Sequence, residues 1–465
     1  MVVRVPDSLR AEREHAVRLV FDTLLGYACR ISFEARSDIA VTLEGSHGPV
    51  LRMPDVLFAS AADWPRGAAR PADSLERFSA PWASVVQCRV PVLFGRKSAN
   101  GRWWEPTADG AYLGVDLPGT AFWMMTRLEE LLDPTRDPHD RFPARASHCL
   151  RAGYLDRPIV DETTALLAIA LQHLWPGMVP RADRYATVLT HDVDRPFKHL
   201  FQSPAQLLRS MAGDLLRRGD LPGVLAAPSR WVRVRRGPDE ADPFFTFEWL
   251  MDQSERAGLS SAFYFICGHS AGRLDGDYGI RHPRIRKLLR RIHARGHELG
   301  VHGSYNSFRC AQTLRGEFEA LRSVCAEEGI SQARWGVRQH VLRFDCARTP
   351  AVWEAAGFAY DATLGYADSA GFRCGTCHPF PLFDHAARRT LKVMERPLVA
   401  MDVTLMSPEY EGLGPDAAAE RIEALRGACR RENGEFVLLW HNCQLTVPGW
   451  RELYARVVKE SACQN

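Results

Sequence analysis

The chain has 465 residues, of which 46% are hydrophobic and 25% charged, an ordinary composition for a folded protein with room for two domains. Its formal net charge of +3 is nearly balanced, so charge gives no reason to expect nucleic acid as a partner. No run approaches the roughly 18 apolar residues of a transmembrane segment, and charges interrupt the N-terminal stretch where a signal peptide would be apolar. These features predict a cytoplasmic location and leave the oligomeric state open.

The first 180 residues contain three segments in which apolar residues recur at helical spacing. They predict helices over residues 9–25, 120–132 and 161–174. Pro176, Gly177 and Pro180 follow the last segment and predict a stop and a linker. We therefore predict a mixed α/β N-terminal domain over residues 1–180, whose role no motif indicates, and a second domain over residues 181–465.

Beyond residue 180, short apolar segments alternate with longer segments of helical spacing, a pattern typical of a parallel α/β architecture. The apolar segments predict strands at residues 186–190, 262–266, 299–301, 333–337, 357–360, 393–398 and 436–440. Polar residues stand just past the ends of five of these strands, namely Asp192, His302, Arg338, Asp361 and His441. Catalytic groups of α/β barrels gather at the carboxyl ends of the strands, so we expect these side chains to meet.

One cysteine spacing among the 12 cysteines needs an interpretation, Cys374-Gly-Thr-Cys377-His378. It matches the attachment site of a c-type haem, but haem attachment requires export, for which the sequence gives no signal. Without export, free thiols are favoured over disulfides. We interpret Cys374 and Cys377 as two loop thiols, with a redox or zinc site as the alternative.

The segment Leu189-Thr190-His191-Asp192-Val193-Asp194 carries two carboxylates at alternate positions. Alternate residues of an extended chain point the same way, so Asp192 and Asp194 share a face. Adjacent carboxylates repel each other unless one binds a cation or takes up a proton. Metal-assisted hydrolysis uses such a pair, and a turn in which the aspartates cap a helix is the alternative.

A second cluster of polar residues runs from His297 to Asn306. If residues 299–301 form a strand, His297 and His302 lie roughly 16 Å apart at its two ends and cannot share a metal. His302, at the carboxyl end, is therefore the candidate ligand. Asn306 can face the same point if the chain turns helically after His302.

Together these segments resemble the polysaccharide deacetylase family (NodB homology, carbohydrate esterase family 4), in particular bacterial members with an N-terminal domain of unknown function. The resemblance covers about residues 185–460 and implies a distorted (β/α)7-type barrel of parallel strands. By the first motif, Asp192 would be the catalytic base and Asp194 a metal ligand. The second motif, usually two histidines four residues apart, here reads His302 and Asn306. Because an asparagine oxygen is a weaker zinc ligand than an imidazole, His340 is the alternative third ligand.

The remaining motifs of the family can also be matched. The segment Trp335-Gly336-Val337-Arg338-Gln339-His340 resembles the third motif, whose arginine, here Arg338, orients the base. Residues 358–366 take the place of the fourth motif, which lines the acyl pocket. The segment that ends in Trp440-His441-Asn442 is similar to the fifth, so His441 would be the general acid. The expected substrate contacts are Asp361, Tyr305 and Trp440.

The resemblance implies a hydrolase that removes N-acetyl groups, or O-acetyl groups, from a sugar or a polysaccharide precursor. It also implies a divalent metal ion, zinc by default, with cobalt, nickel or manganese as other options. Relatives often accompany surface-polysaccharide genes, which makes an acetylated carbohydrate the expected partner. Two alternatives stay open: an amidohydrolase acting on a C–N bond of a small metabolite, and a catalytically idle carbohydrate-binding protein.

Overall fold

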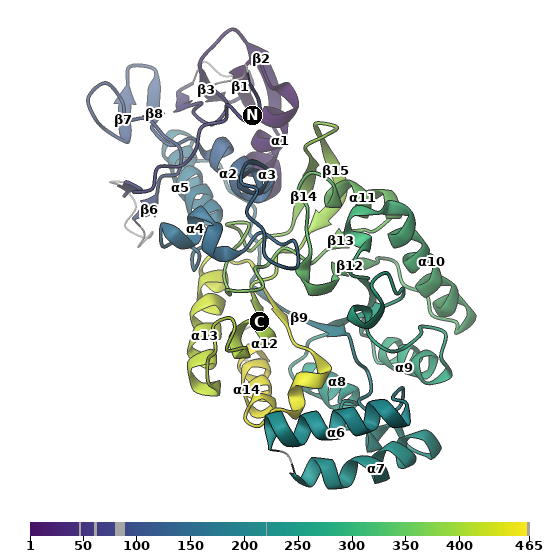
Figure 1. Cartoon of the computed structure of the whole chain (residues 1–465). Coiled ribbons are helices and arrows are strands. Elements are labelled where there is room, and N and C mark those ends of the chain that lie inside the picture. The colour runs from purple at the N-terminus through teal and green to yellow at the C-terminus, as the bar shows by residue number, and fades with distance from the viewer. Residues whose placement is uncertain (46–47, 60–62, 80–88, 220, 463–465) are drawn as a thin grey trace.

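In the computed structural model, the chain folds into a mixed α/β structure with two large sheets and one short strand pair (Figure 1). The structure describes residues 1–45, 48–59, 63–79, 89–219 and 221–462. None of the helices within these ranges combines the length and the hydropathy of a membrane span.

The N-terminal part contains a six-stranded sheet with the order β2-β1-β3-β4-β8-β7. The strands of this part, including the separate pair β5–β6, are Val2–Pro6 (β1), Arg30–Glu34 (β2), Asp38–Thr42 (β3), Val50–Pro54 (β4), Arg77–Phe78 (β5), Val90–Pro91 (β6), Trp104–Thr107 (β7) and Gly110–Leu113 (β8). Its helices are Arg10–Arg18 (α1), Leu117–Met125 (α2), Leu128–Leu132 (α3), His148–Arg151 (α4) and Ile159–Leu174 (α5).

The helices predicted in this part are present, with one interruption. α1 continues as a π-helix over Leu19–Leu24 and covers the first prediction, and α5 covers the third. The helix predicted over residues 120–132 is instead two helices, because Arg127 between them has a left-handed φ of 56°. The Arg127 guanidinium donates hydrogen bonds to Glu130 and to the backbone oxygen of Met124, which stabilises the break.

The larger sheet has nine strands in the order β14-β15-β13-β12-β11-β10-β9-β17-β16 and curls into an open half-barrel (Figure 1). Its described ladders are parallel except the one between β14 and β15. The strands are Ala186–Val193 (β9), Ser261–Ile266 (β10), Glu298–Gly303 (β11), Gly336–Gln339 (β12), Tyr360–Asp361 (β13), Phe380–Asp384 (β14), Arg389–Glu395 (β15), Ala400–Met401 (β16) and Glu435–Leu439 (β17).

The seven predicted strand segments each overlap a strand of this sheet, which confirms the parallel α/β architecture. The sheet differs from the expected seven-stranded barrel by two strands, β14 and β16. β14 forms an antiparallel hairpin with β15, and β16 has only 2 residues, too few for a periodic pattern. Among the described strands no ladder joins β16 to β14, so the curl stays open.

Amphipathic helices cover the larger sheet. In α9, for example, Ile285, Leu288, Leu289 and Ile292 are buried, at the spacing that places them on one helix face. The helices of this part are Pro204–Arg218 (α6), Leu221–Arg236 (α7), Phe247–Arg256 (α8), Pro283–Ala294 (α9), Ala311–Glu327 (α10), Thr349–Ala356 (α11), Asp402–Met406 (α12), Pro415–Arg431 (α13) and Trp450–Ala462 (α14).

The two parts of the chain share one apolar core. Phe122 of α2 packs edge-on against Phe383 of β14, with 5.2 Å between ring centroids. Glu130 and Arg373, both buried, form an ion pair of 2.7 Å across the same contact. The domain boundary predicted at residue 180 falls between α5 and β9 and stays a prediction.

Candidate active site

Three potential metal ligands meet at the carboxyl ends of β9, β11 and β12. Asp194 follows β9, His302 lies in β11, and His340 begins the 3-10 turn after β12. Asp194 Oδ1 lies 3.1 Å from His302 Nε2 and 3.7 Å from His340 Nε2. The convergence follows from the topology, because parallel strands open their carboxyl ends on the same edge of the sheet.

The hydrogen bonds around these ligands leave His302 Nε2 and Asp194 Oδ1 free to bind a common ion. His302 Nδ1 donates a hydrogen bond of 2.9 Å to the backbone oxygen of Arg338, so in the neutral ring the free electron pair is on Nε2, facing Asp194. Asp194 Oδ1 is buried and accepts no hydrogen bond from the described residues. Two buried acceptors this close repel each other unless a positive charge lies between them. The residues therefore fit a divalent cation with nitrogen and oxygen ligands, such as zinc.

The electrostatics of the group agree with this interpretation. Burial acts to raise the pKa of the Asp194 carboxyl, but His340, His302 and His441 outweigh it and hold that pKa below its ordinary value. Burial acts to lower the pKa of His302, but the carboxylates of Asp192 and Asp194 raise it overall. Negative charge is thus concentrated where a cation would bind.

A buried carboxylate behind His340 supports the third ligand position. Asp275 Oδ1 lies 3.5 Å from His340 Nδ1, and the Asp275 carboxylate accepts backbone hydrogen bonds from Ala271 and Tyr305. Burial acts to raise the pKa of Asp275, but His340 and these backbone donors lower it to about 2. An ionised Asp275 beside Nδ1 leaves Nε2 of His340 as the nitrogen that faces Asp194.

Asp192 and Arg338 form a buried ion pair at the floor of the site. Arg338 Nη1 lies 3.2 Å from Asp192 Oδ1 and donates a 2.9 Å hydrogen bond to the Thr190 hydroxyl. Arg338 Nε donates to the backbone oxygen of Ala362, so the guanidinium is held in one orientation. The other Asp192 oxygen lies 3.6 Å from His302 Nε2, next to the possible metal position. A fixed carboxylate at that distance can accept a proton from a water molecule beside the cation.

His441 faces the same point from the opposite side. Its Nε2 lies 3.7 Å from Asp194 Oδ2, and its Nδ1 lies 2.7 Å from Asp402 Oδ1. The other Asp402 oxygen accepts a 2.7 Å hydrogen bond from the His441 backbone nitrogen. Burial acts to lower the pKa of His441, but Asp402 and then Asp194 raise it to about 10. An imidazole directed at the site with its pKa raised in this way can donate a proton there, as a general acid must.

These side chains line a cavity of about 160 Å³. Asp192, Asp194, His302, His340 and His441 form its polar wall, and apolar residues that follow β12 and β16 form another wall. Two further lining residues, His139 and Arg141, come from the N-terminal part of the chain. The cavity therefore combines a polar reaction centre with space for an apolar group such as an acyl methyl.

Asn306, expected as a metal ligand, lies outside this group. Its side-chain oxygen accepts a 3.1 Å hydrogen bond from Arg343, and its side-chain nitrogen donates to the backbone oxygen of Ser270. The chain makes a 3-10 turn from Ser307 to Arg309 there, so the spacing of four residues does not bring Asn306 back over His302. The structure thus brings the alternative ligand His340, rather than Asn306, beside Asp194 and His302, and the ligand set stays a prediction.

None of the three expected substrate contacts lines the cavity. Asp361 is fully buried and accepts hydrogen bonds from the backbone nitrogen and the hydroxyl of Thr363. Trp440 is also fully buried and packs against Trp450 and Tyr454. The Tyr305 hydroxyl lies 3.1 Å from His139 Nδ1 rather than in the cavity. Strand-end position placed these residues near the site but did not determine which way their side chains point.

Asp402 and Asp275, which orient the two histidines, were not predicted. Asp402 directly follows the short strand β16, as other site residues follow their strands, so recognition of that strand would have revealed it. Asp275 stands in a 3-10 turn, Gly272–Asp275, where no sequence pattern singles it out.

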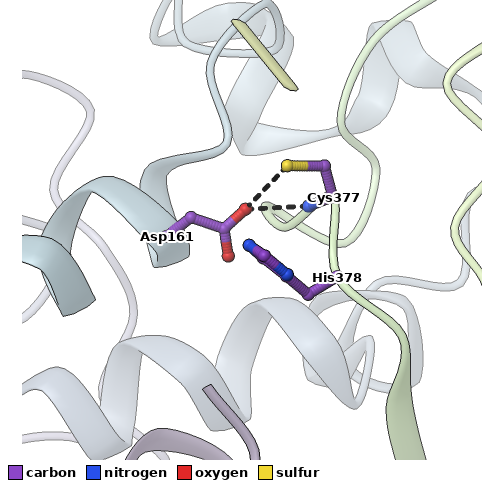
Figure 2. Close-up of side chains that lie close together, drawn as sticks. All are labelled: Asp161, Cys377 and His378. Carbon is purple, nitrogen blue, oxygen red and sulfur yellow. Dashed lines mark hydrogen bonds between the residues drawn. The ribbon is translucent and has the colours of Figure 1, made fainter. Parts of the chain in front are cut away.

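A second group of potential ligands lies at the contact between the two parts of the chain. Figure 2 shows Asp161 of α5 beside Cys377 and His378 of the loop before β14. One Asp161 oxygen accepts hydrogen bonds from the Cys377 backbone nitrogen (2.8 Å) and thiol (3.2 Å), and the other accepts one from the Thr376 hydroxyl (2.6 Å). His378 Nε2 lies 3.1 Å from the backbone oxygen of Glu432. These ligand atoms are thus already engaged in hydrogen bonds within the protein.

The two cysteines of the Cys-x-x-Cys-His segment are both buried. Burial raises the pKa of Cys374 to about 12, and burial together with Cys429 and Asp161 raises the pKa of Cys377. A redox role or a haem linkage needs a reactive thiol, which a buried thiol of raised pKa does not supply. The interpretation as loop thiols fits this environment, with the addition that Cys377 is a donor to Asp161.

Comparisons with known proteins give three results. A model of a family of unknown function, DUF7033, matches residues 1–176. A solved structure described as "putative polysaccharide deacetylase from Mycobacterium smegmatis" is 19% identical with a TM-score of 0.40, over 62% of this chain and 87% of that chain. The comparison with curated proteins found no match. A structural likeness of this size carries no argument, so the geometry of the site has to support any function.

Proposed function

We propose that the protein is a metal-dependent hydrolase that removes an N-acetyl group, or an O-acetyl group, from a carbohydrate. The observation that supports this most is the convergence of Asp194, His302 and His340 with two proton-transfer groups, Asp192 and His441, around one cavity. A site with carboxylate and imidazole ligands and no sulfur suits zinc, and also cobalt, nickel or manganese. A divalent ion bound there supplies Lewis acidity to the acyl carbonyl and to a water molecule.

Asp192 acts as the general base in this proposal. Its carboxylate takes a proton from the water molecule that attacks the acyl carbon. The ion pair with Arg338, 3.2 Å long and fully buried, fixes the orientation of the Asp192 carboxylate. Hydrogen bonds from Arg338 to Thr190 and Ala362 prevent the guanidinium from following the carboxylate out of position.

His441 acts as the general acid. Its Nε2 donates a proton to the nitrogen or oxygen atom that leaves when the acyl bond breaks, which gives acetate and a free amine or alcohol. Asp402 binds Nδ1 and so directs Nε2 at the cavity. The proton taken up by Asp192 and the proton given by His441 balance the hydrolysis.

Acetate release from a panel of acetylated sugars, oligosaccharides and cyclic amides tests the proposal. Release from a carbohydrate should fall by about 10²–10⁴-fold in Asp192→Ala and in His441→Ala, while both variants keep the wild-type fold by circular dichroism. The matched control is Asn306→Ala, which removes the expected ligand that lies outside the group and should keep most of the activity.

The same panel discriminates between the two alternatives. Hydrolysis of cyclic amides without acetate release would support the amidohydrolase. Saccharide binding without hydrolysis, despite added zinc, cobalt or nickel, would support the idle carbohydrate-binding protein. Near-wild-type turnover in either Asp192→Ala or His441→Ala would contradict the roles assigned to these residues.

A further inference from the structure

Residues 133–146 of the N-terminal part, called the strap here, cross the opening of the catalytic cavity. The strap joins α3 to α4 and lies within the residues that match the family of unknown function. Its residues His139 and Arg141 line the cavity together with the metal-ligand group. A segment far from the catalytic residues in sequence thus forms one wall of the site.

The strap is attached to the loops that follow β11, β12 and β13. Asp140 pairs with Arg309 at 2.5 Å, and the backbone oxygen of His139 accepts a 2.9 Å hydrogen bond from Arg343. The backbone nitrogen of Ala144 donates to Asp368 at 2.9 Å. These three contacts fix the strap along one side of the opening.

Arg141 extends the attachment to the other side. One guanidinium nitrogen donates a 3.0 Å hydrogen bond to the backbone oxygen of Val341, after β12, and another donates a 3.1 Å hydrogen bond to the hydroxyl of Tyr410, after β16. In the sheet order, β12 and β16 lie on opposite sides of β9, which carries Asp192. Arg141 is only 8% exposed and therefore bridges the opening beside the reaction centre.

The strap holds its shape by its own contacts. Asp137 accepts hydrogen bonds from the backbone nitrogens of His139 and Arg141 and pairs with the Arg141 guanidinium at 2.6 Å. Asp140 takes a left-handed φ of 61°, which turns the chain back toward the sheet. Because Asp137 balances the charge of Arg141, the guanidinium acts here as a bridge rather than as a free anion receptor.

We propose that the strap restricts the cavity to one acylated residue: the end of a saccharide chain or a small acylated amino sugar. The inference rests on the proposed function. The cavity of about 160 Å³ is smaller than the roughly 300–1,000 Å³ of pockets that enclose drug-sized ligands. An interior residue of a polymer needs space on both sides for its neighbours, and the Arg141 bridge occupies one side. The N-terminal part thereby acquires a role in substrate selection.

The position of deacetylation in short oligomers tests this proposal. Oligomers of two to six N-acetylglucosamine residues are incubated with the zinc-loaded full-length protein, and mass spectrometry locates each free amine. The wild type should deacetylate only a terminal residue. Arg141→Ala, which removes the bridge, should raise the share of interior deacetylation by about 10-fold. Tyr410→Phe deletes one hydrogen bond of the bridge and should shift the pattern in the same direction by less.

Arg145→Ala is the matched control, because Arg145 is an exposed arginine of the same strap that does not line the cavity. It should keep the wild-type pattern. Interior deacetylation by the wild type, or an unchanged pattern in both bridge variants, would overturn the role of the strap while the proposed function stands. Release of no acetyl group from any oligomer or monomer would instead reject the proposed function, and the role of the strap with it.

Discussion

The residues that the structure describes form two groups of potential metal ligands, which differ in whether the ligand atoms already take part in hydrogen bonds. At the active-site group, Asp194 Oδ1 is buried, has no hydrogen-bond donor in the described part of the chain, and lies 3.1 Å from His302 Nε2. At the contact between α5 and the loop before β14, both oxygens of Asp161 accept hydrogen bonds and the Cys377 thiol donates one of them. Among the described residues, Asp194 Oδ1 thus has no hydrogen-bond donor, whereas both oxygens of Asp161 have one.

The comparison shows that closeness of ligand-type residues does not define a metal site. The ligand atoms of each group lie within 4.8 Å of one another. A buried acceptor without a donor is costly and therefore favours a cation site, whereas an acceptor with its donors in place favours a structural contact. The two groups are thus expected to respond differently when a residue of each is replaced.

The largest expected effect is on metal content. Wild-type protein loaded with zinc and freed of excess metal should hold about one ion per chain, and His302→Ala should hold less than about one tenth of that, because a ligand is lost. The matched variant Cys377→Ser should keep the ion. Elemental analysis of the three proteins measures this. Loss of zinc from Cys377→Ser with retention in His302→Ala would reverse the roles assigned to the two groups.

Next in size is the effect of Asp161→Ala on stability. The substitution leaves the Thr376 hydroxyl and the Cys377 backbone nitrogen without their acceptor, at roughly 1–3 kcal/mol each. We expect a loss of about 3 kcal/mol, seen in calorimetry as a lower melting temperature. Asp156→Ala is the control, since its ion pair with Arg421 also joins the two parts but its side chain is 60% exposed. That variant should cost about 0.5 kcal/mol, and equal losses in both variants would contradict a special role for Asp161.

The smallest expected effect concerns Asp402, a positioning residue. Asp402→Asn removes the carboxylate that lies 2.7 Å from His441 Nδ1 but leaves the His441 imidazole itself unchanged. We expect kcat for acetate release to fall about 10-fold, with KM and zinc content near wild type. Steady-state kinetics checks the division between kcat and KM. A change confined to KM would show that Asp402 acts on substrate binding instead.

The sequence predicted the parts of the site that depend on strand topology. Asp194, His302 and His441 stand at the carboxyl ends of predicted parallel strands. These ends lie on the same edge of the sheet and do not depend on the conformation of the loops. The side chain of Asn306 points toward Arg343 and Ser270, a direction set by the turn after β11, and Asp275 gave no signal because it stands in a 3-10 turn. Local loop geometry is set by tertiary contacts, which spacing alone does not contain.

In the fold, too, regular elements could be predicted from the sequence, whereas features that depend on tertiary contacts could not. Helices with a buried face, such as α5, are visible in the sequence, since their apolar residues repeat over several turns. The break at Arg127 is not visible, because besides its local hydrogen bonds to Glu130 and Met124 the Arg127 guanidinium donates one to the backbone oxygen of Arg373, 246 positions away. The position of the strap is likewise not visible in the sequence, since its partners across the opening lie 166 or more positions further along the chain.

The common apolar core has a consequence for how this chain can be divided. Phe383 of β14 is 2% exposed, and it owes part of that burial to Phe122 and His15 on the other side of the contact. A fragment beginning at residue 181 would present these apolar surfaces to water and invite aggregation. The part of the chain from residue 181 onward therefore depends on the N-terminal part to cover its apolar surface, and we expect the two parts to fold only when expressed together.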